Sequence, residues 1–438
     1  MTALLTRWAL AVLLCASLAL PALPSRAAAD RYPATTMIDD VPSQVDRDAA
    51  LAGVQILLPG GLDRQSSIQN GYAALLGEVV AETPVSLNGS QQRLRDAVAA
   101  LGANLSVTVQ PQDVRYYVEG RPQAVSAALG LLGAALRAPD FSRETLARAK
   151  HALQLRITEA DQSPFGVVSA MLRSAYYESS GAGYEPMGSP AVVVNASASQ
   201  LQAFWSANYL QGGAFIAAAG NVDEGVARAA HAAVALLPQG TPQPVVLGVR
   251  KLSDSPVRVI THRDVGLPWV GIGFAAPALG SKDFAAMLVV QAIIASLGRT
   301  DSIVSRPAAL RPINAVYQYD VRPANFIVYS SGSSLGSPEG LREIFAATEL
   351  LASKPLDDNV IERYRTLAEG QFIIDNMTLE DRSALLGTMS RLGVDGDPNA
   401  VLSEVAAVTP ADVERVVKAY LSKYTVAIIL PRVTSKQP

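Results

Sequence analysis

The sequence predicts an α+β fold in two homologous domains, and three observations lead to this prediction. The chain has 438 residues, which is long for one hydrophobic core and favours two or more domains. Three prolines and a glycine fall within residues 237–244, where neither a helix nor a central strand can continue. The order of expected strands and helices is the same on both sides of this segment. We therefore expect domains at 30–237 and 257–438, joined by a linker at 238–256.

The first half shows strand periodicity, helix periodicity and turn signals in a clear order. Polar and apolar residues alternate in two neighbouring segments, which predicts a two-stranded antiparallel unit. Gly102 follows an apolar-faced stretch and is a natural end for a helix. The expected elements are a strand at 53–58, helices at 68–80 and 91–101, paired strands at 104–109 and 114–119, and helices at 123–136 and 143–160.

The second half repeats this order, and the two half-ends match most closely. A hydroxyl residue that can cap a helix and a Tyr-Leu exit precede a strand in each half, at 199–219 and 409–430. The alternative is two unrelated α+β domains with chance similarity, which the shared order makes less favourable. The other expected elements are strands at 257–260 and 269–274, a helix at 284–297, paired strands at 315–321 and 326–330, and helices at 341–352 and 360–372.

The N-terminus has the pattern of a signal peptide at residues 1–29. Arg7 precedes an apolar stretch at 8–20, which is too short for a comfortable transmembrane helix. The small residues Ala27–Ala29 then predict cleavage before Asp30. We expect an exported protein, periplasmic or secreted, with no membrane attachment after cleavage. The alternative is an uncleaved membrane anchor.

Composition excludes several classes of function. The net charge is −3 with interspersed signs, so neither nucleic acid nor a polycation is an expected partner. Cys15, the single cysteine, lies within the apolar stretch, so the mature chain has no thiol for disulfide, redox or metal chemistry. Hydrophobic residues make up 49% of the chain and charged residues 17%, which is typical of a well-packed globular protein.

Several short segments carry a family resemblance: 60–63, 71–78, 101–106, 204–209 and 220–222 in the first half, and 271–277 and 283–286 in the second. In this order along the chain, they resemble the pitrilysin/insulinase-type metallopeptidase family. Each is mostly apolar residues and glycine, and together they cover nearly the whole mature chain. The resemblance implies that each domain is an antiparallel-rich mixed sheet with helices packed on one face, and that the domains form a clamshell. It also implies that a peptide substrate adds an extended strand to an exposed sheet edge.

The zinc motif of active family members is absent from the matching helix. They carry H-x-x-E-H, in which two histidines bind zinc and the glutamate activates water. Here Ala74, Gly77 and Glu78 occupy the first, fourth and fifth motif positions. The family's third ligand is a glutamate on a later helix, and Arg156 occupies that place, with Glu159 one turn away. The resemblance therefore implies a zinc-less member with no metal ligands and no catalytic residues.

No other chemistry replaces the missing site. His151, His231 and His262 are far apart in sequence, so they form no metal-binding pair. His151 lies near the third-ligand helix, and a metal role for it is the less favoured alternative. There is no G-x-S-x-G, P-loop or dinucleotide motif.

The resemblance also implies two candidate substrate-binding residues in the second domain. Active members place an arginine and a tyrosine where negative charge develops on the scissile carbonyl. Arg311 and Tyr317 match them, although Tyr317 is one residue closer than the usual spacing, and Tyr319 lies one pleat further on. The competing interpretation is a solvated arginine at a turn and a tyrosine packed on a strand.

The expected function is that of a non-catalytic subunit in an exported zinc metallopeptidase complex. In some family members one subunit carries zinc and the other does not, which predicts a zinc-bearing sibling as partner and a peptide as substrate. This chain would then bind the peptide and complete its partner's active site. We expect it to be inactive alone and to take part in catalysis only within a metalloendopeptidase heterodimer.

The alternative is a catalytically inactive peptidase-fold protein that serves as a structural or binding module in an envelope complex. A sibling with an intact H-x-x-E-H in the same operon would favour the first interpretation.

Overall fold

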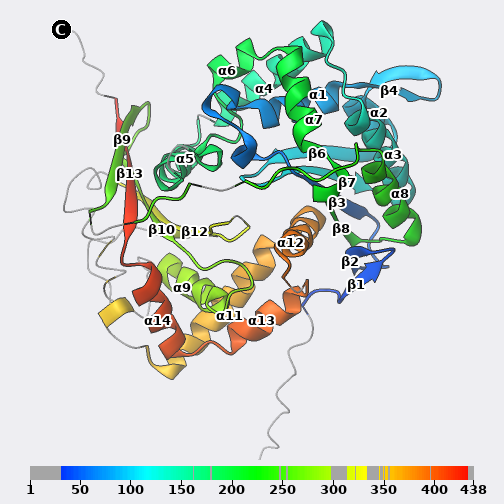
Figure 1. Ribbon diagram of the computed structural model, residues 1–438. Helices are drawn as coiled ribbons and strands as arrows, with labels where there is room; N and C mark the ends of the chain where they lie inside the picture. The colour runs from blue at the N-terminus through cyan, green and yellow to red at the C-terminus, as the bar shows by residue number, and fades with distance from the viewer. Residues whose placement is uncertain are drawn as a thin grey trace, which may run out of the picture.

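The computed structural model describes residues 31–160, 162–177, 180–245, 248–252, 255–296, 313–320, 322–332, 345, 349, 351–353, 356–394 and 396–432. These residues form two lobes, each built on a sheet (Figure 1). The expected signal peptide at 1–29 and the candidate residue Arg311 lie outside the described residues. Among the described helices, none combines the length and apolar character needed to cross a membrane.

The first sheet has the strand order β1-β2-β8-β3-β7-β6. Strand β3 is buried throughout, and its residues Val54, Ile56 and Leu58 face a core shared with the helices of this half. The strands are β1 (Thr35–Ile38), β2 (Val41–Val45), β3 (Ala52–Leu58), β6 (Ala103–Val109), β7 (Val114–Gly120) and β8 (Phe215–Gly220). The helices are α1 (Tyr72–Glu82), α2 (Leu94–Ala100), α3 (Pro122–Arg137), α4 (Arg143–Ala160), α6 (Pro190–Asn195), α7 (Ala198–Asn208) and α8 (Glu224–Ala235).

The second sheet has the strand order β11-β12-β10-β13-β9, and its own core includes residues from 270 to 428. Its strands are β9 (Val257–Arg263), β10 (Trp269–Ala275), β11 (Asn314–Gln318), β12 (Asn325–Ser331) and β13 (Tyr424–Pro431). Its helices include α9 (Phe284–Ser296), α11 (Asp358–Asp375), α13 (Pro398–Ala406) and α14 (Pro410–Tyr420).

The two sheets repeat one topology, which confirms the predicted pair of homologous α+β domains. The order β2-β8-β3-β7-β6 corresponds to β9-β13-β10-β12-β11. In both sheets the first two strands of this series pair in parallel, and the remaining neighbours pair antiparallel. The strand β6 and its counterpart β11 therefore end their sheets in the same way.

One helix from each half packs on the sheet of the other half. Helix α5 (Pro164–Tyr176) places Val168 and Leu172 against the second sheet, where Gly271 leaves space for Val168. Helix α12 (Leu379–Leu392) crosses the first sheet, where a methyl group at Gly387 would overlap Leu57. Figure 1 shows α12 between the two lobes. The close approach of these glycines allows each half to cover part of the other half's sheet.

The structure corrects two of the expected helices. Residues 91–93 are not helical, because β5 (Ser90–Arg93) pairs with β4 (Pro84–Leu87) and α2 begins only at Leu94. The helix expected from residue 68 begins at Tyr72, because Gly71 has a φ of 117° and interrupts the helical path after a short turn at Ser67–Gln69. The paired strands 103–109 and 114–120 and helix α4 follow the prediction closely.

Candidate functional site

Helix α1 carries the three positions that correspond to the zinc motif. Ala74 is 4% exposed and presents a methyl group where the motif has its first histidine. At Gly77, a Cβ atom would lie 2.8 Å from Val107 Cγ1 of β6, which is closer than real contacts allow. The strand therefore occupies the space in which the side chain of a general base would begin.

Glu78 meets the arginine that corresponds to the third ligand. Glu78 Oε1 lies 2.6 Å from Arg156 Nη1 of α4, and Glu78 Oε2 lies 2.7 Å from Arg95 Nη2 of α2. The glutamate side chain is 7% exposed, whereas the two arginine side chains are 37% and 38% exposed. Two positions that are 78 residues apart in sequence thus form one charge-assisted contact.

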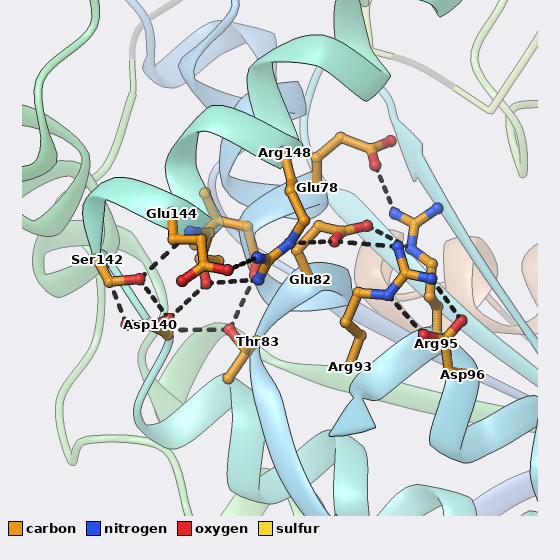
Figure 2. A network of polar contacts seen from close by, with 12 residues as sticks. Glu78, Glu82, Thr83, Arg93, Arg95, Asp96, Asp140, Ser142, Glu144 and Arg148 are labelled. Atoms are coloured by element: carbon orange, nitrogen blue, oxygen red, sulfur yellow. Dashed lines mark hydrogen bonds and ion pairs between the residues drawn. The ribbon is translucent and has the colours of Figure 1, made fainter. Parts of the chain in front are cut away.

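Arg95 extends the contact into a network around Glu82 (Figure 2). Glu82 is one turn after Glu78 on α1 and its side chain is 3% exposed. Arg95 Nε lies 2.8 Å from Glu82 Oε1, an ion pair without hydrogen-bond alignment. Arg148 Nε of α4 donates to Glu82 Oε2 at 3.1 Å, and Arg93 Nη1 lies 3.6 Å away. We call Glu78, Glu82, Arg93, Arg95, Arg148 and Arg156 the arginine-glutamate network.

The residues of this site do not fit a zinc ion. Zinc requires nitrogen, sulfur or carboxylate ligands, and Ala74 and Gly77 supply none. Glu78 supplies a carboxylate, but two guanidinium groups already bind it, and Arg156 would repel a cation. The described residues contain no group of three or more His, Cys, Asp or Glu side chains placed to hold a metal.

The histidines lie in unrelated surroundings. His151 is exposed on α4, and His262 is exposed on β9. His231 Nε2 lies 2.6 Å from the backbone carbonyl of Asp39.

The structure places Tyr317 on the edge strand β11 of the second sheet. Its side chain is 5% exposed, and its hydroxyl donates to the carbonyl of Pro277. Its ring contacts Phe284, and burial raises its pKa far above the usual value. Tyr319 lies directly after the last residue of β11. Its phenol oxygen accepts a hydrogen bond from Asn376 Nδ2 at 3.3 Å. The substrate-binding role of Arg311 and Tyr317 stays a prediction.

The edge strand β6 runs beside α1 and has a partner strand on one side. Five of its residues, from Asn104 to Thr108, are partly or fully exposed. Ser106 Oγ donates to Glu380 Oε1 of α12 at 2.9 Å, so the helix from the other half reaches this edge. In an antiparallel pair, alternate residues of an edge strand point their N–H and C=O groups outward. This edge is therefore suited to pairing with an added strand.

A buried charged cluster at the junction of the halves was missed by the sequence analysis. Arg115 Nε donates to Asp113 Oδ1 at 2.7 Å, and Arg391 Nε of α12 lies 3.1 Å from Asp113 Oδ2. Arg115 Nη2 also lies 3.7 Å from Asp320 of the second half. Burial lowers the pKa of Arg391, while Asp113 opposes that shift. No local sequence signal marks such a cluster, because its members come from separate elements.

Comparisons with known proteins agree with these features. Residues 43–189 match the sequence profile described as insulinase (peptidase family M16). No curated protein matches the chain in sequence.

Several solved structures have the same fold over most of both chains. A protease from Helicobacter pylori is 16% identical, with a TM-score of 0.74, and the match covers 92% of this chain and 100% of that one. An inactive M16 peptidase domain from Pseudomonas fluorescens is 16% identical, with a TM-score of 0.73 and coverage of 93% and 100%. A chain of Complex III2 from Candida albicans is 14% identical, with a TM-score of 0.74 and coverage of 92% and 97%.

Proposed function

We propose that this chain, a zinc-less protein of the insulinase-type M16 family, is the non-catalytic subunit of a zinc metallopeptidase complex. It binds an extended peptide and completes the active site of a zinc-bearing sibling subunit. The zinc belongs to that sibling, and the complex is exported to the periplasm or the exterior. The family is supported by the match at 43–189 and by the two-lobed fold.

The arginine-glutamate network is the observation that carries the proposal. Arg156 of α4 forms an ion pair with Glu78 of α1, and these two helices hold the metal in active relatives. The Glu78 carboxylate is therefore already paired and is not available as a metal ligand. A chain with this arrangement has no means of activating water for peptide hydrolysis. The preserved fold and the free edge of β6 beside α1 support a retained role in peptide binding.

A structural role is the second candidate function. The similar chain of Complex III2 belongs to an assembly, which supports a catalytically inactive module in an envelope complex. The engagement of the Tyr317 hydroxyl by Pro277 also favours this alternative, because that donor is not free to act on a substrate.

The deciding experiment combines metal analysis with reconstitution. The purified chain, and the chain mixed with an M16 sibling encoded beside it that carries H-x-x-E-H, are dialysed and analysed for zinc. Both samples are then assayed with quenched fluorescent peptides.

We expect no stoichiometric zinc and no turnover by the chain alone, and zinc with turnover in the complex. Chelator-sensitive cleavage by the chain alone would overturn the proposal. A stable complex whose turnover does not depend on this chain would favour the structural role. N-terminal sequencing of the native protein tests export, with Asp30 as the expected first residue.

A further inference from the structure

A large cavity along the described chain lies mainly in the second half, away from the arginine-glutamate network. It has a volume of about 770 Å³ and is bounded by β11, by α9 and α11 of the same half, and by α12 where that helix crosses toward the first sheet. Figure 1 shows α12 between the lobes, above α9 and α11.

The cavity follows the edge of β11. Every residue from Asn314 to Asp320 lines it. Successive side chains of a strand point to opposite faces of the sheet, so consecutive residues can line one cavity only if it runs along the strand's open edge. Among the strands that the structure describes, β11 ends the sheet and pairs with β12 on its other side.

A side-chain amide meets this edge at one point. Gln291 Nε2 of α9 donates a 3.3 Å hydrogen bond to the backbone carbonyl of Ala315. An added strand would make the same kind of contact, from its backbone N–H to this carbonyl. The 3.3 Å distance is longer than that of an ordinary N–H···O bond, so we expect the backbone of a bound peptide to replace the amide readily.

The cavity is the duplicated counterpart of the site on α1. Helices α4 and α11 each have 18 residues, and Arg156 and Gln371 are both the fourteenth residue of their helix. In the first half, Arg156 reaches across to Glu78 and closes the space between α4 and α1. In the second half, Gln371 instead turns along its own helix and donates to Asp375 Oδ1 at 2.7 Å, so the space beside β11 stays open.

One end of the cavity is acidic. Asp375 of α11 and Asp381 of α12 both line it, and burial together with the nearby Asp381 raises the pKa of Asp375. The other charged residues of the lining are Asp320, Arg115 and Arg363. Arg115 is already paired with Asp113 and Asp320, and Arg363 is twelve residues before Asp375, which places it about 18 Å away along the helix. A cationic group beside Asp375 and Asp381 would therefore be attracted.

We propose that this cavity binds an extended peptide, which adds to β11 as a strand and places a lysine or arginine side chain beside Asp375 and Asp381. The five residues of β11, Asn314–Gln318, provide an edge of about 17 Å. Main-chain hydrogen bonds would supply affinity, and the acidic end would supply selectivity. The proposal rests on the proposed role in peptide binding and places the peptide at β11, not at β6. Its test uses the isolated chain, so the outcome of the partner experiment does not decide it.

The test measures binding of fluorescein-labelled seven-residue peptides by anisotropy. The peptides alternate valine and threonine and carry one central lysine or, in a matched series, one central glutamate. Two further lysine peptides are N-methylated at odd or at even positions. We expect the lysine peptide to bind about twofold to fivefold more tightly than the glutamate peptide, as one partly exposed charge pair allows. We expect one N-methylated peptide to lose binding and the other to keep it, because alternate N–H groups face the sheet edge.

The variant Asp375→Asn keeps the side-chain shape and should remove the preference for lysine. Glu224→Gln is the matched control, because it removes the same charge from an exposed residue of α8 in the first half and should change nothing. Hydrogen exchange locates the peptide, and protection at 314–320 is expected. Protection at 103–109 instead, equal binding of both charge series, equal loss with both N-methylated peptides, or no binding at all would overturn the proposal.

Discussion

Arg156 Nη1 of helix α4 lies 2.6 Å from Glu78 Oε1 of helix α1. The family resemblance matches both positions to metal ligands, so an ion pair now joins two helices that a metal joins in active relatives. The charge at the third-ligand position is reversed, because the cationic side chain of Arg156 stands where active relatives have a carboxylate. The contact fastens α4 to α1 and offers no exchangeable ligand. An ion pair thus links the two helices at the positions that the resemblance matches to metal ligands.

We predict that Arg95 contributes more to stability than Arg156. Arg95 contacts both buried carboxylates, Glu78 and Glu82, whereas Arg156 contacts Glu78. Leaving a buried charge without its partner is strongly destabilising. Arg95→Ala should therefore lower the free energy of unfolding by about 3 kcal/mol and Arg156→Ala by about 1 kcal/mol, discounted for the partial exposure of both arginines.

Urea unfolding followed by circular dichroism measures both changes. Arg228→Ala is the control, because its pair with Glu224 is exposed on α8 and should contribute about 0–0.5 kcal/mol. Equal effects of Arg95→Ala and Arg156→Ala would show that the bridging position of Arg95 has no energetic consequence.

The sequence identified the site on α1 but not its internal contacts. Ala74, Gly77 and Glu78 were found through the family resemblance, and helix α4 was predicted with the observed bounds. The contact between Glu78 and Arg156 could not be found, because it depends on how two helices pack.

The exchange of α5 and α12 could not be predicted either. An apolar helix face shows that the helix is buried, but it does not show which sheet covers it. The packing of Val168 on the second sheet depends on Gly271, about a hundred residues later in the chain. The short hairpin of β4 and β5 was missed because Ser90–Arg93 is polar and lacks the alternation of a half-buried strand.

We predict that Arg391 holds the two halves together. Its side chain is 14% exposed, and it forms an ion pair with Asp113, whose side chain is 2% exposed and belongs to the first half. Arg391→Ala should lower the free energy of unfolding by about 3 kcal/mol, because Asp113 keeps Arg115 but loses half of its charge compensation. Urea unfolding measures the loss, with Lys418→Ala, from an exposed pair on α14, as the control. A change of less than about 0.5 kcal/mol would rule out this contribution.

We predict a pH-dependent effect of Asp63, which lies near the same cluster. Burial raises the pKa of Asp63 from 3.8 to about 6, with a further rise from Asp113, while Arg64 and Arg391 oppose the shift. A carboxyl group with a raised pKa in the folded state stabilises the fold when protonated, and this contribution is lost as the pH rises from 3.8 through about 6. Asp63→Asn should therefore raise stability by about 1–3 kcal/mol at pH 7.5 and by almost nothing at pH 4.

Chemical denaturation at several pH values tests the sign as well as the size of this effect. Asp48→Asn is a matched control, because it makes the same substitution at an exposed position of the first half. A stabilisation by Asp63→Asn that grows toward low pH would contradict the prediction.

The last prediction concerns catalysis in the reconstituted complex. If this chain completes its partner's active site, Arg311→Ala should lower kcat about 100-fold to 1000-fold without weakening assembly, because such a donor acts on charge that develops in the transition state. One of the tyrosine variants, Tyr317→Phe or Tyr319→Phe, should have a similar effect. Tyr317 must first release the carbonyl of Pro277, whereas Tyr319 accepts a hydrogen bond from Asn376 and lines the cavity beside β11.

Stability of the isolated chain separates the two roles of Tyr317. Its hydroxyl satisfies a buried carbonyl, so Tyr317→Phe should cost about 1 kcal/mol in the free energy of unfolding whether or not a partner is present. Complex formation and turnover are therefore measured separately, at a temperature where every variant is folded. If the complex forms and all three variants keep normal turnover, the shared active site is wrong. The structural role would then follow, because the donors would serve the fold of this chain and not the chemistry of its partner.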